Sequence, residues 1–136
     1  MTAADAFLDT NVILYLLSAN TAKAERAESL VAGGAQISVQ VLNELVAVMR
    51  RKFGMKWGEV ADFTSGIRTV CRVNAVTVEV HERGLALAQR LGLSIYDGTI
   101  IASALIAGCQ TLYSEDMQDG QVIERRLTVR NSFPGG

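Results

Sequence analysis

Two patterns of hydrophobic and polar positions alternate along this chain, and together they predict its secondary structure. Short apolar runs, which are typical of buried strands, occur at 7–8, 35–39, 72–76, 111–114 and 127–130. Between these runs, apolar residues recur every three or four positions, which is the spacing of a helix face. This second pattern predicts helices at 12–17, 21–32, 40–53, 57–71, 77–91 and 94–107.

The alternation of strands and helices favours an α/β fold. Consecutive strands separated by a helix usually pair in parallel through right-handed crossovers, so we expect a mainly parallel sheet. The run 127–130 is the last strand and is expected at an edge of that sheet. At 136 residues the chain is large enough to bury a core, and we expect residues 1–136 to form a single domain.

Composition excludes several classes of protein. The apolar runs are shorter than the ~20 residues of a membrane-spanning helix, and no secretory signal is recognisable, so a cytoplasmic location is expected. Cys71 and Cys109 match neither a metal-binding spacing nor a disulfide framework, and we interpret them as reduced core thiols. The net charge of -1 decides neither for nor against a nucleic-acid partner.

Asp9 is the first residue whose chemistry is unusual for its surroundings. It directly follows the apolar run at 7–8, so it lies where a strand ends, at the edge of a parallel sheet where α/β folds bind ligands. A carboxylate in such apolar surroundings has to be paired, hydrogen-bonded or bound to a cation. The simpler alternative is that Asp9 only caps the helix that follows.

Glu44 and Asp97 lie on predicted helices. Glu44 is at the edge of the apolar face of the helix at 40–53, and its alternative role is an ion pair with Arg51 on the same stripe. Asp97 is in the first turn of the helix at 94–107, where a capping box with Ser94 would explain it equally well.

Asp116 follows the strand at 111–114, as Asp9 follows an earlier one, although acids are also common in ordinary loops. Asp9, Asp97 and Asp116 are therefore expected at one edge of the sheet, where the helix bearing Glu44 also begins. Two carboxylates ~4 Å apart repel by roughly 4 kcal/mol at an effective dielectric of 20, so their gathering favours a bound cation.

Mg²⁺, or Mn²⁺ in its place, is the cation that such a set of ligands favours. These ions prefer oxygen ligands and are commonly held by carboxylates and water. Zinc would call for histidine or cysteine ligands, and the single histidine, His81, is expected on the surface.

Four short segments carry a resemblance to a known family. They are Ala6-Phe7-Leu8-Asp9-Thr10-Asn11-Val12, Val41-Leu42-Asn43-Glu44-Leu45, Ile95-Tyr96-Asp97-Gly98-Thr99-Ile100-Ile101-Ala102-Ser103-Ala104 and Leu112-Tyr113-Ser114-Glu115-Asp116. In this order they resemble the four acidic motifs of PIN-domain ribonucleases. The size of the chain and the loop at 114–120 are most similar to the VapC toxins of bacterial toxin–antitoxin pairs.

The resemblance implies a fold and a set of site residues. The fold is a PIN-like three-layer α/β arrangement, with a central mainly parallel sheet flanked by helices. The implied catalytic and metal-binding residues are Asp9, Glu44, Asp97 and Asp116. Residues expected to support these acids are Asn11, Ser114 and, at a position where the family is variable, Asp119. Of the neighbouring acids at 115 and 116, we assign Asp116 to the metal because Ser114 aligns with the Ser/Thr of the family.

The resemblance also implies an activity and partners. The activity is Mg²⁺-dependent hydrolysis of RNA phosphodiester bonds by an activated water, performed by the toxin of a type II toxin–antitoxin system. The implied partners are the RNA substrate, a cognate antitoxin and a second copy of the chain in a homodimer, with no membrane. Arg51, and after it Arg50, are our candidates for contacts with the RNA backbone.

Two other functions compete with this interpretation. One is a Mg²⁺ phosphohydrolase that uses Asp9 as covalent nucleophile, but that class normally carries a second acid two residues on, where this chain has Asn11. The other is a non-catalytic PIN-like module that binds protein or RNA. The presence of all four acids argues against it.

Overall fold

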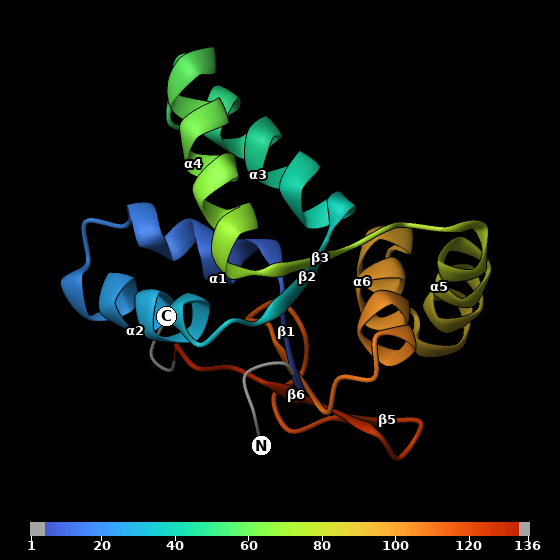
Figure 1. Cartoon of the computed structure of the whole chain (residues 1–136). Coiled ribbons are helices and arrows are strands. Elements are labelled where there is room, and N and C mark those ends of the chain that lie inside the picture. Colours follow the sequence, from blue (N-terminus) through green and yellow to red (C-terminus); the bar gives the residue numbers. More distant parts are fainter. Residues whose placement is uncertain (1–4, 134–136) are drawn as a thin grey trace.

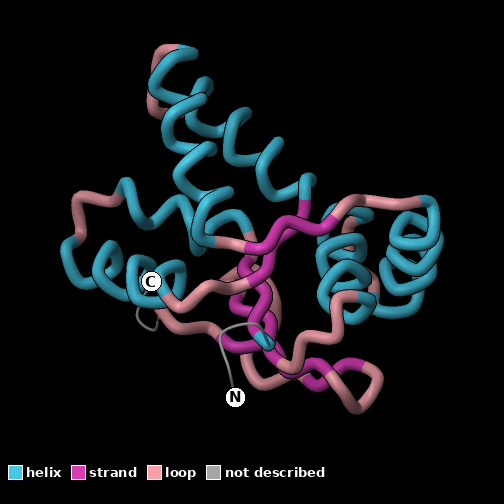
Figure 2. The backbone as a smooth tube through the Cα atoms, viewed as in Figure 1, coloured by secondary structure: helices cyan, strands magenta, loops and turns pink. Residues whose placement is uncertain are grey.

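The computed structural model describes residues 5–133, which form a six-stranded sheet with helices on both sides (Figures 1 and 2). The strand order is β3-β2-β1-β4-β6-β5. All pairs are parallel except β5 with β6, so the prediction of a mainly parallel sheet is confirmed. The strands are β1 (Ala6–Leu8), β2 (Gln36–Ser38), β3 (Arg72–Asn74), β4 (Thr111–Tyr113), β5 (Val122–Ile123) and β6 (Leu127–Arg130).

The helices form two layers around this sheet, as the PIN-like α/β arrangement requires. In Figure 1, α5 and α6 lie on one side of the sheet and α1 and α2 on the other, while α3 and α4 run side by side away from it. Within residues 5–133, no helix combines the length and the hydrophobicity that crossing a membrane needs. The helices are α1 (Thr10–Leu14), the 3₁₀ turn η2 (Tyr15–Leu17), α2 (Thr21–Ala32), α3 (Val39–Arg51), α4 (Trp57–Val70), α5 (Val78–Leu91) and α6 (Ile95–Ile106).

Short polar side chains begin most of the long helices. Asn20, Ser38, Thr77 and Ser94 precede α2, α3, α5 and α6, and each side-chain oxygen accepts a hydrogen bond from a backbone N–H of the first turn. Gly92 ends α5 in the left-handed conformation, with φ +68°. These local signals explain why the predicted starts of α5 and α6 agree with the structure.

The core lies on both faces of the sheet. Its largest fully buried side chains come from the central strands and from the helix faces that pack on them, and burial of each contributes roughly 1.5–3 kcal/mol. They include Phe7, Leu8, Ile13, Ile37, Leu45, Ile100, Ile101, Leu105, Leu112 and Leu127. Cys71 and Cys109 are buried thiols outside any disulfide, as predicted.

Two glycines bring α5 and α6 into close contact. A Cβ atom added at Gly84 would lie 2.8 Å from Oγ1 of Thr99, and one added at Gly98 would overlap the carbonyl oxygen of Gly84. Neither position therefore has room for a side chain. The contact fixes the first turn of α6, which carries Asp97, against α5.

The prediction that 127–130 forms an edge strand is wrong. β5 pairs with β6 in antiparallel fashion and occupies the edge instead. β5 has only two residues, too few to show the alternation of a strand. Glu124 and Arg125, between the two strands, both have positive φ, of 52° and 59°. The usual signal for such a hairpin turn, Asn-Gly or Asp-Gly, is absent here.

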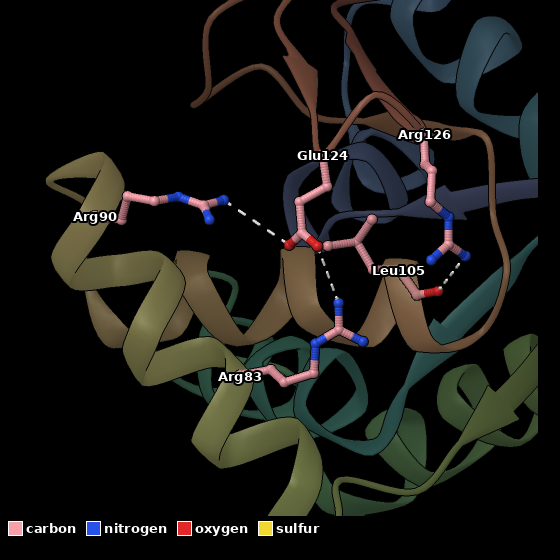
Figure 3. A network of polar contacts seen from close by, with 5 residues as sticks. All are labelled: Arg83, Arg90, Leu105, Glu124 and Arg126. Atoms are coloured by element: carbon pink, nitrogen blue, oxygen red, sulfur yellow. Dashed lines mark hydrogen bonds and ion pairs between the residues drawn. The ribbon is translucent and has the colours of Figure 1, made fainter.

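Ionic and polar contacts hold this hairpin against the helices (Figure 3). Glu124 accepts from Arg83 at 3.3 Å and pairs with Arg90 at 3.8 Å, and both arginines belong to α5. Arg126 donates to the carbonyl oxygen of Leu105 in α6 at 3.3 Å. The far edge of the sheet is thus attached to the same helix pair that positions Asp97.

Candidate active site

Asp9 lies at the carboxyl end of β1 and is only 5% exposed. Its Oδ1 accepts from the backbone N–H of Thr10 at 2.7 Å, which makes it the N-cap of α1. Its Oδ2 accepts from the hydroxyl of Ser114 at 2.8 Å. The capping role that we considered as an alternative is therefore present, and it uses one of the two carboxylate oxygens.

The sheet register explains why Ser114 meets Asp9. β1 and β4 are parallel neighbours in which Leu8 is paired with Tyr113, so the next residue of each strand lies at the same edge. The N–H of Asp9 donates to the carbonyl oxygen of Tyr113 at 3.0 Å and prolongs the pairing by one bond. This single strand pair brings together Asp9 and Ser114, which are more than a hundred positions apart in the chain.

Glu44 reaches the same edge from α3. It is half-buried, and its Oε1 accepts from the hydroxyl of Thr10 at 2.9 Å. Among residues 5–133, Glu44 forms no ion pair with Arg51, so the structure does not support the alternative role of Glu44 as the partner of that arginine. Sequence reasoning assigned no role to Thr10; the available signal was a hydroxyl residue directly after Asp9 in the strand-to-helix turn.

Asp116 faces this edge and its neighbour Glu115 does not. Oδ2 of Asp116 accepts from the side-chain amide of Asn11 at 2.7 Å, and its N–H donates to the hydroxyl of Ser114 at 3.3 Å. The carboxylate of Glu115 is bound by the Tyr15 hydroxyl at 2.6 Å. Tyr15 therefore holds the first acid of the pair away from the others.

Asp97 is half-buried in the first turn of α6, and its N–H donates to the hydroxyl of the capping residue Ser94 at 3.1 Å. Burial, and after it the nearby Asp116, raises the pKa of Asp97 above its usual range. Burial also raises the pKa of Asp9 to about 6, against the hydrogen bonds from Ser114 and Thr10 that lower it; Asp97 and Asp116 add to the rise. Neighbouring carboxylates therefore contribute to the raised pKa of both Asp9 and Asp97.

All four predicted acids line one pocket of about 260 Å³. Its remaining walls come from the N-terminal part of α1 and from α3. The complete lining is Asp9, Thr10, Asn11, Glu44, Ala47, Val48, Arg51, Asp97 and Asp116. A larger hollow of about 600 Å³ begins at the opposite end of β4 and is lined by arginines instead of these acids.

Two other residues predicted at the site, Asp119 and Arg50, lie outside the acidic pocket. Asp119 is exposed and accepts from the backbone N–H of Asn131 at 2.9 Å, outside the pocket. Arg50 donates to the carbonyl oxygen of Met55 at 2.9 Å, and its guanidinium lies 4.4 Å from the centre of the Trp57 ring. Of the two arginines predicted to contact RNA, only Arg51 lines the acidic pocket.

The donor atoms of this pocket fit a hydrated hard cation. In the described part of the chain, no three His, Cys, Asp or Glu side chains converge closely enough to enclose an ion. Mg²⁺ does not need such a cage, because it keeps several waters and binds one or two carboxylates together with substrate phosphate. Among residues 5–133, no lysine or arginine forms an ion pair with any of the four acids. Carboxylate, amide and hydroxyl oxygens without sulfur or imidazole suit Mg²⁺ or Mn²⁺ better than zinc.

Comparison with known proteins gives a family and several similar structures. The family model for the PIN domain matches residues 6–118. No curated protein matches the chain. The structure is similar to VapC20 of Mycobacterium tuberculosis, described as a sarcin–ricin loop cleaving toxin, with 28% identity and a TM-score of 0.65 over 79% of this chain and 86% of that one.

Two more distant structures share the fold. One is a toxin–antitoxin complex from Klebsiella pneumoniae, with 19% identity and a TM-score of 0.69 over 90% of this chain and 95% of that one. The other is VapBC2 of Rickettsia felis bound to a DNA fragment from its promoter, with 20% identity and a TM-score of 0.61 over 93% of this chain and 97% of that one.

Proposed function

Because the chain belongs to the PIN domain family, we propose that it is a Mg²⁺-dependent endoribonuclease and the toxin of a type II toxin–antitoxin pair. One observation carries this proposal: acids from four separate segments line a single pocket, and no basic side chain among residues 5–133 forms an ion pair with them. The description of VapC20 as a toxin that cleaves the sarcin–ricin loop supports the choice of RNA as substrate.

In this proposal Asp9, Glu44, Asp97 and Asp116 hold one or two Mg²⁺ or Mn²⁺ ions. When bound, the metal would activate water for in-line attack and offset charge on the phosphate and the leaving oxygen. The hydrogen bonds around the acids set their orientation. The Ser114 hydroxyl and the N–H of Thr10 hold Asp9, the Thr10 hydroxyl holds Glu44, and the Asn11 amide holds Asp116.

Arg51 is our candidate for contact with the RNA backbone. It lines the acidic pocket two turns after Glu44 on α3, and no carboxylate among residues 5–133 pairs with it. A cation at this place offsets the repulsion between the acids and the phosphates. Arg50 is bound to Met55 and stacked on Trp57, so it does not share this role.

We also propose a cognate antitoxin and a homodimer as partners, in the cytoplasm. The description of the Klebsiella structure as a toxin–antitoxin complex supports the antitoxin, and the homodimer and the location follow from the resemblance to the VapC toxins alone. Co-purification of the chain with the product of a short neighbouring reading frame, and inhibition of cleavage by that product, would test the antitoxin assignment.

Cleavage of total RNA with Mg²⁺ and with EDTA tests the activity. We expect cleavage only with the metal, and a loss of at least a hundredfold in Asp9→Asn, because a neutral amide is a much poorer ligand for a hard cation. Asp119→Asn is the matched control, since it removes an acid outside the pocket. Equal cleavage by wild type and Asp9→Asn would contradict the mechanism, and metal binding without cleavage of any RNA would favour a non-catalytic module.

The phosphohydrolase alternative is disfavoured by the surroundings of Asp9. Asn11, two residues after Asp9, stands where that class carries its second acid, and its side-chain amide donates to Asp116 at 2.7 Å. A covalent phosphoenzyme trapped with a phosphate mimic would restore that alternative.

A further inference from the structure

A second hollow lies directly beside the acidic pocket. It has a volume of about 400 Å³ and shares the lining residues Glu44 and Ala47 with that pocket, so the two are adjacent. We call it the Tyr96 groove. Its lining is Val39, Gln40, Asn43, Glu44, Ala47, Val76 and Tyr96.

The Tyr96 groove exposes an aromatic ring next to the acids. Tyr96 is 64% exposed and directly precedes Asp97, and Val39 and Val76 add apolar surface that is 40% and 41% exposed. An exposed ring of this kind is a platform on which an unpaired base can stack. A base stacked there would lie within one residue of a proposed metal ligand.

Two amides on α3 add hydrogen-bonding groups to the groove. Gln40 uses its Nε2 to donate to the carbonyl oxygen of Tyr96 at 3.1 Å, which ties the start of α6 to α3. Asn43 has an exposed carboxamide, and no hydrogen bond of its side chain is present within residues 5–133. A carboxamide offers a donor and an acceptor side by side, which matches the edge of a nucleobase.

We propose that the Tyr96 groove is a nucleobase subsite of the nuclease. An unpaired RNA base beside the scissile phosphate stacks on Tyr96, and Asn43 hydrogen-bonds to its edge. The inference rests on the proposed ribonuclease activity and adds to it a site of base recognition, which takes an unpaired base because a base inside a duplex cannot leave its stack to enter the groove. The volume suits a base with part of its ribose.

A second copy of this chain is the competing occupant. Val39 and Val76, with Val78 nearby in sequence at 73% exposed, would suit a subunit interface. Burying the Asn43 carboxamide without a partner in such an interface would cost free energy, whereas a base edge satisfies it. The position of the groove directly beside the acidic pocket also favours the substrate.

Cleavage kinetics on short single-stranded RNAs test the subsite. Tyr96→Ala should lower kcat/KM roughly tenfold to a hundredfold, the range that base stacking supplies, while Tyr96→Phe keeps the ring and should stay within about threefold of wild type. Asn43→Ala should relax the base preference at one position beside the cleaved bond. Trp57→Ala is the matched control, because Trp57 is 63% exposed and lies outside the groove.

A binding measurement makes the test independent of turnover. In an Asp9→Asn background, 2-aminopurine is placed at successive positions of a short RNA. We expect strong quenching of its fluorescence at one position, lost in Tyr96→Ala and retained in Tyr96→Phe.

The outcomes separate the two proposals. If wild type cleaves RNA and Tyr96→Ala does so with unchanged kcat/KM and base pattern, the subsite is wrong and the nuclease stands. If Tyr96→Ala turns a dimer into a monomer in sedimentation and slows cleavage of all sequences equally, the groove is a subunit interface and the subsite is again wrong. If wild type cleaves no RNA, the proposed function fails, and the Tyr96-dependent quenching alone decides the subsite.

Discussion

Asp9 is a buried carboxylate whose charged form costs folding free energy at neutral pH. Burial raises its pKa to about 6, so at neutral pH the folded protein holds a carboxylate that its surroundings disfavour. The rise corresponds to about 3 kcal/mol of folding free energy, relative to a carboxyl with an ordinary pKa. The hydrogen bonds from Ser114 and Thr10 recover part of the lost hydration.

The first prediction concerns the stability of Asp9→Asn in metal-free buffer. Because the folded pKa is raised, the folded state binds a proton more tightly than the unfolded state, and Asp9 lowers stability as pH rises from about 4 to about 6. Asn carries no such charge. We therefore expect the free energy of unfolding of Asp9→Asn, measured by urea denaturation in EDTA, to rise relative to that of wild type across this pH range. At pH 7 the difference should be on the order of 1–3 kcal/mol. A difference that does not change with pH would contradict this account.

The second prediction concerns the two thiols. Burial raises the pKa of Cys71 and of Cys109 to about 11, with a further contribution at Cys109 from Asp5. A raised pKa leaves little thiolate at pH 8, and the thiolate is the reactive form. Iodoacetamide should therefore modify neither thiol in the native protein, and both in urea, as followed by mass spectrometry. Modification of the native protein at the rate of a free cysteine would refute the burial of that thiol.

Among the secondary-structure elements, α6 matters most for the candidate site, because its first turn contains Asp97. Its position depends on contact with α5 through Gly84 and Gly98. The contact joins backbone to backbone, so it leaves little freedom to adjust.

The third prediction is that Gly98→Ala destabilises the protein by about 1–3 kcal/mol and reduces cleavage, since the added methyl group meets the backbone of α5 and shifts Asp97. Gly66→Ala in α4 is the control: a Cβ there meets nothing within 4 Å, and alanine should add up to about 1 kcal/mol of stability. Thermal denaturation and the RNA assay measure both effects. Equal behaviour of the two variants would show that the contact does not matter.

The sequence predicts those elements that have local signals. Ser94, Thr77 and Gly92 mark helix ends, and the structure confirms them. β5 could not be predicted, because two residues are too few to show the alternation of apolar and polar positions in a strand. In addition, Glu124 and Arg125 adopt a turn that their residue types do not indicate.

Side-chain partners were harder to predict than elements. The four acids could be listed from their positions after strands and at helix edges. The bonds from Thr10 to Glu44 and from Tyr15 to Glu115 depend on how β1, α3 and β4 come together, which no local pattern describes.

At the scale of the whole molecule, the proposed metal site in the acidic pocket would couple metal binding to folding. The fourth prediction is that Mg²⁺ or Mn²⁺ raises the melting temperature, because an ion that binds only the folded chain stabilises it by mass action. At a concentration a hundred times the dissociation constant, the gain is about 2.7 kcal/mol. Asp9→Asn should lose most of this shift, and Asp119→Asn should keep it. A melting temperature that neither ion changes would contradict the metal site.

The parallel pairing of β1 with β4 has a consequence for the time at which a newly made chain becomes active. Asp9 precedes its partner Ser114 and the nearby Asp116 by more than a hundred residues, so ribosomes reach these two only long after Asp9. A polypeptide still being translated before that point lacks half of the strand pair that assembles the pocket. Ribosomes that stall before Ser114 would therefore release fragments without the assembled pocket, and the ribonuclease activity that we propose would arise only after Asp116 has been made.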